Sequence, residues 1–113
     1  TNTTNAKTLA AVRKQVPVVA INIIDALDGK APTAEYDGYG SCPLTVERGK
    51  IVLAEFTYGG KLAPTFPKWL NDGTRPTRFA WQLKAKVLPA LYWHGMLKGH
   101  EWLTAPKRST ELA

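Results

Sequence analysis

Apolar residues recur at helical spacing over residues 7–27, the longest periodic stretch of the chain. The apolar positions are Leu9, Val12, Val16, Val19, Ile23 and Leu27. This spacing places them on one face of a helix, with charged residues such as Arg13, Lys14 and Asp25 on other faces. The pattern therefore predicts a long helix over residues 7–27 that packs most of its apolar face into a core.

The ends of this helix and a proline inside it carry further signals. Thr4 or Asn5 can cap its start, and Gly29, followed by Pro32, can end it. Pro17 lies in the middle of the pattern. Because proline lacks a backbone N–H and its ring clashes with the preceding turn, we expect a kink or two abutting helices there.

The middle of the chain has the pattern of a β-hairpin. Two aliphatic stretches, residues 44–46 and 51–58, flank the sequence Glu-Arg-Gly-Lys at residues 47–50. Gly49 can adopt the positive φ that such a turn requires. Residues 30–40, rich in proline, glycine and small polar residues, are predicted to be a connection, so Cys42 lies just before the first strand.

Prolines and glycines mark residues 59–77 as an irregular loop, for which Phe66 and Trp69 are the predicted anchors. From Arg78 to Leu103, aromatic and aliphatic residues are interleaved with lysines. This pattern predicts two helices joined at Pro89. The fold class is therefore α+β, with a long kinked N-terminal helix, a short antiparallel sheet and a helical, aromatic and basic C-terminal tail.

Composition narrows the class of protein. The chain has 113 residues, of which 44% are hydrophobic, enough for one small domain. The net charge of +6 favours an anionic partner such as lipid headgroups, nucleic acid or an acidic domain. No apolar run approaches the roughly 18 residues that would span a bilayer, so any membrane contact would be peripheral. The start at Thr1, without methionine, suggests an excised or processed piece.

The cysteine and histidine content bears on redox and metal chemistry. With one cysteine and two histidines the chain can form no internal disulfide and has too few ligands for a structural zinc site, so we expect no metal. The cysteine, Cys42, lies in the glycine-rich sequence Tyr-Asp-Gly-Tyr-Gly-Ser-Cys-Pro-Leu. Free cysteines are usually small buried hydrophobes. A tight turn followed by proline instead favours an exposed, positioned sulfur.

Four segments in order resemble the C-terminal region of sulfide:quinone oxidoreductases, especially the branch that contains the mitochondrial enzyme. They are residues 6–15, residues 36–44 around Cys42, residues 50–56, and residues 83–84 with 88–93. These enzymes are flavoproteins of the pyridine nucleotide-disulfide oxidoreductase superfamily. The resemblance implies that residues 1–77 are the end of a flavin-binding domain and that residues 78–113 are a helical tail associated with membrane and quinone.

The resemblance also implies roles for individual residues. In the family, a helix beginning at the position of Lys7 and Thr8 points its N-terminus at the flavin, so these two residues are expected to contact FAD. A helix N-terminus stabilises negative charge on a reduced flavin ring. Cys42 matches the cysteine expected to accept the sulfide sulfur from a disulfide or sulfur-bridged pair. Its partner cysteine is absent from this chain.

The tail is expected to reach both the quinone and the membrane. Lys84 matches a lysine near flavin and quinone that could steer protons. The expected membrane contacts of a monotopic protein at a bacterial or mitochondrial inner membrane are Leu88, Leu91, Tyr92, Trp93, Met96 and Leu97.

No Gly-x-Gly-x-x-Gly turn occurs, so this chain cannot be a whole flavoenzyme and should be inactive alone. Its expected partners are the N-terminal flavin-binding domains, quinone, sulfide and the membrane surface. We expect no nucleic-acid partner. Surfaces meant for the missing domains could make it dimerise.

Two other interpretations stay open. The four tryptophans and the lysines could form a small basic module that binds nucleic acid or an anionic membrane, which explains the charge but not Cys42. The chain could also come from a type II NADH dehydrogenase, which shares the helix and the membrane tail. That family ordinarily lacks the Ser-Cys-Pro segment, so the motif argues against it.

Overall fold

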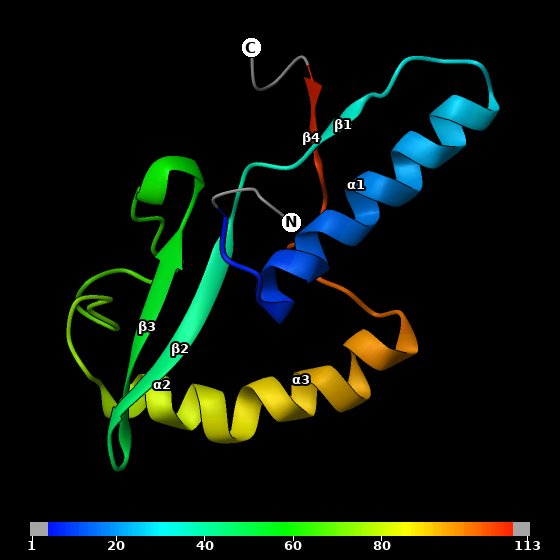
Figure 1. The fold of residues 1–113 in the computed structure, drawn as a ribbon. Helices are drawn as coiled ribbons and strands as arrows, with labels where there is room; N and C mark the ends of the chain where they lie inside the picture. Colours follow the sequence, from blue (N-terminus) through cyan, green and yellow to red (C-terminus); the bar gives the residue numbers. More distant parts are fainter. Residues whose placement is uncertain (1–4, 110–113) are drawn as a thin grey trace.

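A computed structural model describes residues 5–109 and has the predicted α+β character (Figure 1). In chain order the elements are α1 (Leu9–Leu27), β1 (Ala34–Glu35), β2 (Gly40–Glu47), β3 (Lys50–Phe56), η1 (Tyr58–Gly60), α2 (Arg78–Gln82), η2 (Leu83–Val87), α3 (Leu88–His94), η3 (Met96–Lys98) and β4 (Lys107–Arg108). They form two separate two-stranded antiparallel sheets, β2 with β3 and β1 with β4. The hairpin of β2 and β3 stands beside α2, and α1 extends away from it.

The first helix is confirmed, but its start and its burial differ from the prediction. Thr8, in extended conformation, is the N-cap residue, so a cap at Asn5 is wrong, and Thr4 lies outside the described residues. Gly29 ends the helix with φ +69°, as expected. The helix runs unbroken through Pro17, so two abutting helices are wrong. A single missing N–H leaves the hydrogen bonds on both sides of the proline in place.

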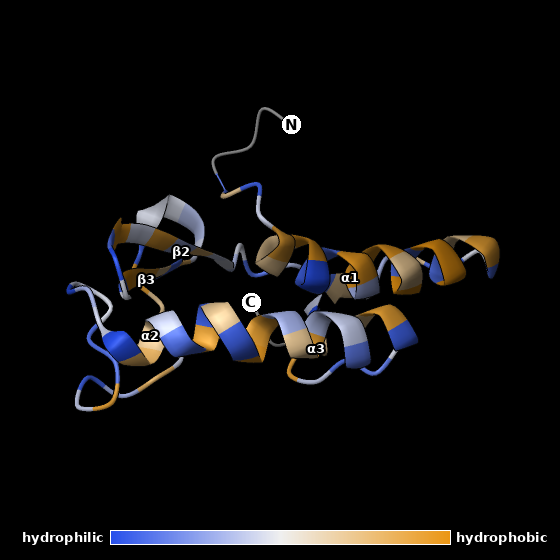
Figure 2. Ribbon diagram, turned by 90° about the horizontal axis from the view of Figure 1, so that it is seen from below, coloured by the Kyte–Doolittle hydropathy of each residue, from blue (hydrophilic) through white to orange (hydrophobic). Residues whose placement is uncertain are grey.

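The apolar face of α1 is mostly exposed rather than packed into a core. Only Ala11 and Val18 are buried. The exposed apolar side chains are Leu9, Val12, Val16, Val19, Ile23, Ile24 and Leu27. Figure 2 shows this hydrophobic colouring along α1. The prediction of a core helix is therefore wrong for the described residues, because no other element covers this face.

The predicted hairpin is confirmed, with a longer first strand than expected, and a second strand that ends at Phe56 rather than at residue 58. Gly49 adopts φ +80° in the turn, and Glu47 pairs with Lys50 across it after an irregularity in the register. Cys42 lies inside β2, opposite Ala54, so its placement on a turn before the strand is wrong. The turn comes earlier, where the Asp37 side chain accepts a hydrogen bond from the Tyr39 N–H at 3.0 Å. Pairing with β3 extends β2 back to Gly40.

The C-terminal rod, residues 78–98, is one run of helical turns rather than two helices meeting at Pro89. Its irregular part is the π-helical segment η2, in which the Leu88 N–H bonds to the Leu83 carbonyl. Pro89 follows in the first turn of α3. The wide π turn accommodates the proline ring, which would otherwise crowd the carbonyl four residues earlier. The helical path ends at Lys98, short of Leu103, and Gly99 caps it with φ +75°.

A small apolar core joins the rod to the hairpin. Ile51, Leu53 and Ala80 are buried, and Phe66, Trp81 and Leu83 pack against them. Thr77 fixes the start of the rod, because its backbone pairs with Ile51 and its hydroxyl oxygen accepts the Ala80 N–H. Phe66 is confirmed as an anchor through an edge contact with Phe79. Trp69 is 84% exposed, so its prediction as an anchor is wrong.

The strap, residues 101–109, returns along the molecule and was not predicted to contain a strand. Its strand β4 pairs with β1, inside a segment that the sequence suggested was only a connection. These strands are two residues long and too short for a sequence pattern. The division of the chain between residues 77 and 78 stays a prediction. None of the helices in residues 5–109 is both long and apolar enough to cross a membrane.

Candidate functional site

A cavity of about 890 Å³ lies between the hairpin, the start of α1, the rod and the strap. This volume is in the range of small-molecule sites. Its walls come from five parts of the chain. They are residues 8–10 and 13–14, strand residues Ser41, Pro43, Leu53 and Glu55, the connection residues Tyr39, Thr65 and Phe66, rod residues such as Leu83, Val87 and Leu91, and residues 102–105 of the strap. Most of these side chains are apolar, so the cavity suits an apolar or amphiphilic ligand.

One end of this cavity, the polar end, is built around Glu55, which is only 5% exposed. Its carboxylate accepts hydrogen bonds from the Tyr39 hydroxyl at 2.6 Å, the Thr65 N–H at 3.0 Å and the Thr65 hydroxyl. Burial, together with the hydrogen bond to Glu55, raises the pKa of Tyr39 to about 12. The phenol therefore keeps its proton throughout the physiological range.

Thr8 brings a second polar group to the wall of the cavity. Its hydroxyl oxygen is buried and has no hydrogen-bond partner in the described residues. A buried polar atom usually has a partner, so an orphan beside a cavity is a site that a ligand can satisfy. Lys7, the neighbouring candidate, is exposed and does not line the cavity, and its ammonium reaches the Asn5 carbonyl at 3.5 Å.

Cys42 lies beside the cavity but does not line it. Its neighbours Ser41 and Pro43 are in the wall, and successive side chains of a strand point to opposite faces. The thiol therefore faces the other side of the hairpin, with Ala54 opposite, and is partly buried. On this other face Leu44 is 45% exposed, so the thiol is next to an apolar surface that the described residues leave uncovered.

Lys84 holds the rod to the strand that carries Cys42. Its ammonium donates to the Pro43 carbonyl at 3.0 Å and to the Thr45 hydroxyl at 2.7 Å. Like Cys42, it does not line the cavity, although its neighbour Leu83 does. The predicted role of Lys84 at a quinone stays a prediction, and the contacts give it a positioning role between η2 and β2.

The structure divides the residues predicted to meet the membrane into two groups. Leu88, Leu91, Tyr92 and Met96 line the cavity. Trp93 and Leu97 point outward and are 61% and 55% exposed. The rod therefore offers one side to the cavity and another to the surroundings.

Comparison with known proteins finds sulfide:quinone oxidoreductases among the relatives of this chain. The chain is 41% identical over 98 residues to the mitochondrial sulfide:quinone oxidoreductase of Dictyostelium discoideum, covering 87% of this chain and 21% of the relative. The corresponding protein of Schizosaccharomyces pombe is 37% identical over 99 residues, covering 86% and 22%. That of Mus musculus is 35% identical over 100 residues, covering 88% and 22%.

This chain is similar to sulfide:quinone oxidoreductases. The resemblance predicted from the four sequence segments is thus confirmed, and it extends over most of the chain. The chain spans about a fifth of the length of the curated relatives that it matches. No protein-family model matches it.

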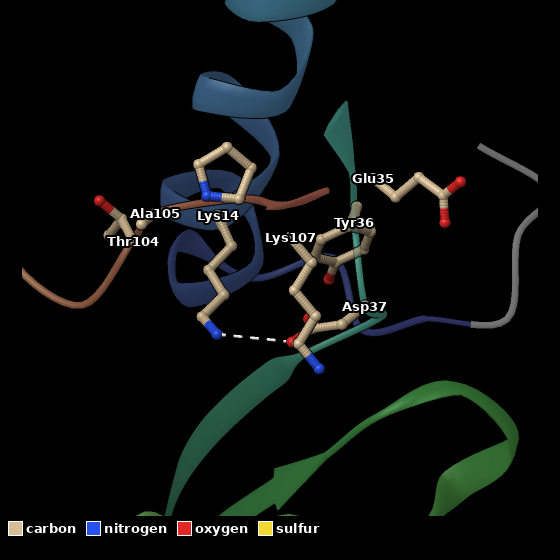
Figure 3. Close-up of a pocket in the computed structure, with 8 residues that line it drawn as sticks. Lys14, Glu35, Tyr36, Asp37, Thr104, Ala105 and Lys107 are labelled. Atoms are coloured by element: carbon tan, nitrogen blue, oxygen red, sulfur yellow. Dashed lines mark ion pairs between the residues drawn. The ribbon is translucent and has the colours of Figure 1, made fainter. Parts of the chain in front are cut away.

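A second, much smaller pocket of about 40 Å³ lies between α1 and the strap (Figure 3). Asp37 lines this pocket, and its carboxylate is 3.6 Å from the Lys14 ammonium and 4.0 Å from that of Lys107. The Lys14 ammonium also lies 4.8 Å from the centre of the Tyr39 ring. The pocket is too small for an organic ligand, and its charges link α1, the segment before β2 and the strap.

The polar end is the part of the site that the sequence did not reveal. Glu55 falls in the aliphatic strand sequence Ile-Val-Leu-Ala-Glu-Phe, where a carboxylate is out of place. A carboxylate within an aliphatic strand could have indicated a polar site, because a buried carboxylate needs specific hydrogen-bond partners. Its partners Tyr39 and Thr65 are 16 and 10 residues away and belong to connections, so only the folded chain brings them together.

Proposed function

We propose that this chain is the C-terminal part of a sulfide:quinone oxidoreductase, which oxidises sulfide through a cysteine pair and FAD and passes two electrons to a membrane quinone. The observation that carries the proposal is the cavity beside Cys42, with an apolar wall from the rod and the start of α1 at its edge. The names of the relatives support it. The dinucleotide-binding turns and the second cysteine would come from the rest of a longer protein.

Cys42 is the proposed acceptor of sulfide sulfur. Hydrosulfide would attack the Cys42 sulfur of a disulfide with the second cysteine, forming a persulfide on Cys42 and releasing the other sulfur as a thiolate. The partly buried position on β2, facing away from the cavity, leaves the thiol open to a partner domain on the uncovered face of the hairpin. A rigid strand positions the sulfur better than a loose turn would.

The start of α1 is the proposed contact with FAD, and its residues fit that group. Thr8 carries a buried hydroxyl with no partner at the cavity wall, and the first N–H groups of α1 have no partners within the helix. A bound flavin supplies the two-electron relay between thiol and quinone. Thr8 and these N–H groups would hold the flavin and would stabilise negative charge on it. Lys7, which is exposed, would contact a more distant part of the cofactor.

The apolar side of the rod is the proposed quinone wall, and its outer side the proposed membrane contact. Leu88, Leu91, Tyr92 and Met96 would pack on the quinone. Lys84 would position β2 against this wall through the Pro43 carbonyl and the Thr45 hydroxyl. Trp93 and Leu97, which are exposed, would enter the headgroup region of a mitochondrial inner membrane as a monotopic anchor.

Replacing the thiol tests this function. In the longer protein that carries this chain, Cys42→Ser should lower sulfide-dependent quinone reduction at least 100-fold, since a hydroxyl cannot form a persulfide. Mass spectrometry should find the added sulfur on Cys42 of the unmodified protein treated with sulfide. Val46→Ala, an exposed change in the same strand, is the matched control and should leave the rate unchanged.

Retention of sulfide oxidation by the Cys42→Ser protein would overturn the proposal. The 113-residue chain alone should show no sulfide-dependent quinone reduction.

A further inference from the structure

The carboxylate of Glu55 is the most deeply buried charged group of the cavity wall. It is 5% exposed, and the ion pairs found within residues 5–109 do not include it. Burying a carboxylate is costly unless hydrogen bonds compensate for the lost water. The proposed thiol chemistry at Cys42 does not need this group, so its place at the wall of a ligand-sized cavity calls for another role.

Counting donors and acceptors shows what Glu55 can still offer. A carboxylate has about four lone-pair sites and no donor. Three sites are used, by the Tyr39 hydroxyl, the Thr65 hydroxyl and the Thr65 N–H. Within residues 5–109 nothing is found on the fourth acceptor site, and Glu55 lines the cavity. The hydroxyl protons of Tyr39 and Thr65 are already directed at the carboxylate, so they are not available to a ligand.

The cations of the cavity wall are also engaged. The Arg13 guanidinium donates to the Glu101 carboxylate at 2.9 and 2.6 Å and to the Trp102 carbonyl at 3.2 Å. The Lys14 ammonium lies 3.6 Å from the Asp37 carboxylate. Neither cation of the cavity wall is therefore free to donate to a ligand head beside Glu55.

We propose that Glu55 makes the polar end select a ligand head that carries a hydroxyl donor, so that the cavity binds the quinol form of a quinone more tightly than the quinone form. This inference rests on the proposed function, which makes a quinone the ligand. The carbonyl oxygen of a quinone has no proton to donate to Glu55. Placed beside the carboxylate, it would bring two acceptors together without a hydrogen bond between them. A quinol hydroxyl would complete the fourth site.

The selection would favour reduction of the bound quinone. If quinol binds about ten times more tightly than quinone, the midpoint potential of the bound two-electron couple rises by about 30 mV relative to the free couple. The same preference would slow release of the product. Glu55 would act as a specificity-determining residue through a hydrogen bond to the ligand head.

The test compares a 4-alkylphenol, which has a hydroxyl donor, with the methyl ether of the same alkylphenol, in which a methyl group replaces the donated proton. Isothermal titration calorimetry on the longer protein that carries this chain should give about tenfold tighter binding of the phenol, equivalent to about 1.4 kcal/mol. In Glu55→Gln the preference should fall to about twofold or less. Glu47→Gln, at an exposed carboxylate of the hairpin turn, is the matched control and should keep the tenfold preference.

A second variant guards against misfolding of Glu55→Gln. Tyr39→Phe removes one donor from Glu55 and leaves the carboxylate free to accept another, so it should retain at least the tenfold preference. Equal affinity of both probes for the unmodified protein would overturn this inference while leaving the proposed function standing. Failure of both probes and of a short-chain benzoquinone to bind would overturn the assignment of the cavity itself.

Discussion

The region of β3 and α2 and the region of α1 both carry apolar side chains at regular spacing, yet only the first is held together by apolar packing. Ile51, Leu53 and Ala80 are buried between β3 and α2. On α1, the exposed fraction of Ile23 is 54% and that of Leu27 is 82%. The first region therefore forms a closed hydrophobic core, whereas the apolar face of α1 is left uncovered by residues 5–109.

Polar contacts attach α1 instead. The Asn22 side chain exchanges two hydrogen bonds with the backbone of Ala34, at 2.9 and 3.0 Å, and the Asp25 carboxylate accepts from the Thr33 N–H at 3.0 Å. Arg13 bonds to Glu101 of the strap. Directional contacts fix the orientation of the helix without covering its apolar face. This arrangement suits a helix whose other face is meant for a further domain, as the proposed function requires.

The largest expected effect is in the core. Ile51→Ala should lower the free energy of unfolding by about 3 kcal/mol, because it removes a fully buried side chain and leaves a cavity. Ile23→Ala, the matched change on α1, should cost under about 1 kcal/mol in the 113-residue chain, where that residue is exposed. Urea denaturation of both variants measures the difference. In the longer protein Ile23→Ala should cost about 2 kcal/mol. An equal cost of Ile23→Ala in the isolated chain and in the longer protein would contradict the view that a further domain covers this face.

Gly38, in the connection between the two regions, comes next. Its φ is +80°, and an added Cβ would lie 2.5 Å from the Tyr58 ring and 2.8 Å from the Tyr58 backbone nitrogen. Gly38→Ala should therefore cost about 2 to 3 kcal/mol, from left-handed strain together with overpacking. Gly49 has the same φ but open space around it, so Gly49→Ala should cost only about 1 kcal/mol. Thermal unfolding of the two variants tests whether the contact with Tyr58, rather than the positive φ, makes Gly38→Ala the more destabilising change.

The contact of α1 with the strap should have a smaller and more local effect. Arg13→Ala leaves the partly buried Glu101 without its partner and should cost about 1 to 2 kcal/mol. Hydrogen exchange should become faster in α1 and the strap and stay unchanged in β3. Lys30→Ala, which breaks an exposed pair with Asp28, should change stability by less than about 0.5 kcal/mol. Uniformly faster exchange after Arg13→Ala would contradict a separate attachment of α1.

Tyr39 should make the stability of the fold depend on pH only in the alkaline range. Its pKa is raised to about 12 from the ordinary value of 10, mainly by burial and by the hydrogen bond to Glu55. A raised pKa contributes stability that is present below pH 10 and is lost as the pH rises through about 12. Unfolding midpoints of the unmodified chain should therefore fall over this alkaline range, and Tyr39→Phe should flatten the fall. An identical pH profile in Tyr39→Phe would show that Tyr39 does not carry this dependence.

Much of the local structure could be predicted from the sequence. The spacing of Leu9, Val12 and Val16 predicted α1, and Gly49 predicted the hairpin turn, because each depends on contacts between near neighbours. The resemblance to sulfide:quinone oxidoreductases was carried by short segments in order and needed no structure. The position of Cys42 inside β2 and the strand in the strap could not be predicted, because they depend on pairing between distant residues.

In the candidate site, too, some features could be predicted from the sequence and others could not. The sequence alone determined which residues have the chemistry: the thiol of Cys42, the ammonium of Lys84 and the aromatic tail. Tertiary structure decided which of them share a cavity, placing Thr8, Leu91 and Tyr92 in its wall and turning Cys42 to the opposite face of the hairpin. It also brought Glu55 to Tyr39 and Thr65. The physical reason is that periodicity fixes only which face of an element a side chain occupies, whereas the packing of elements fixes what that face meets.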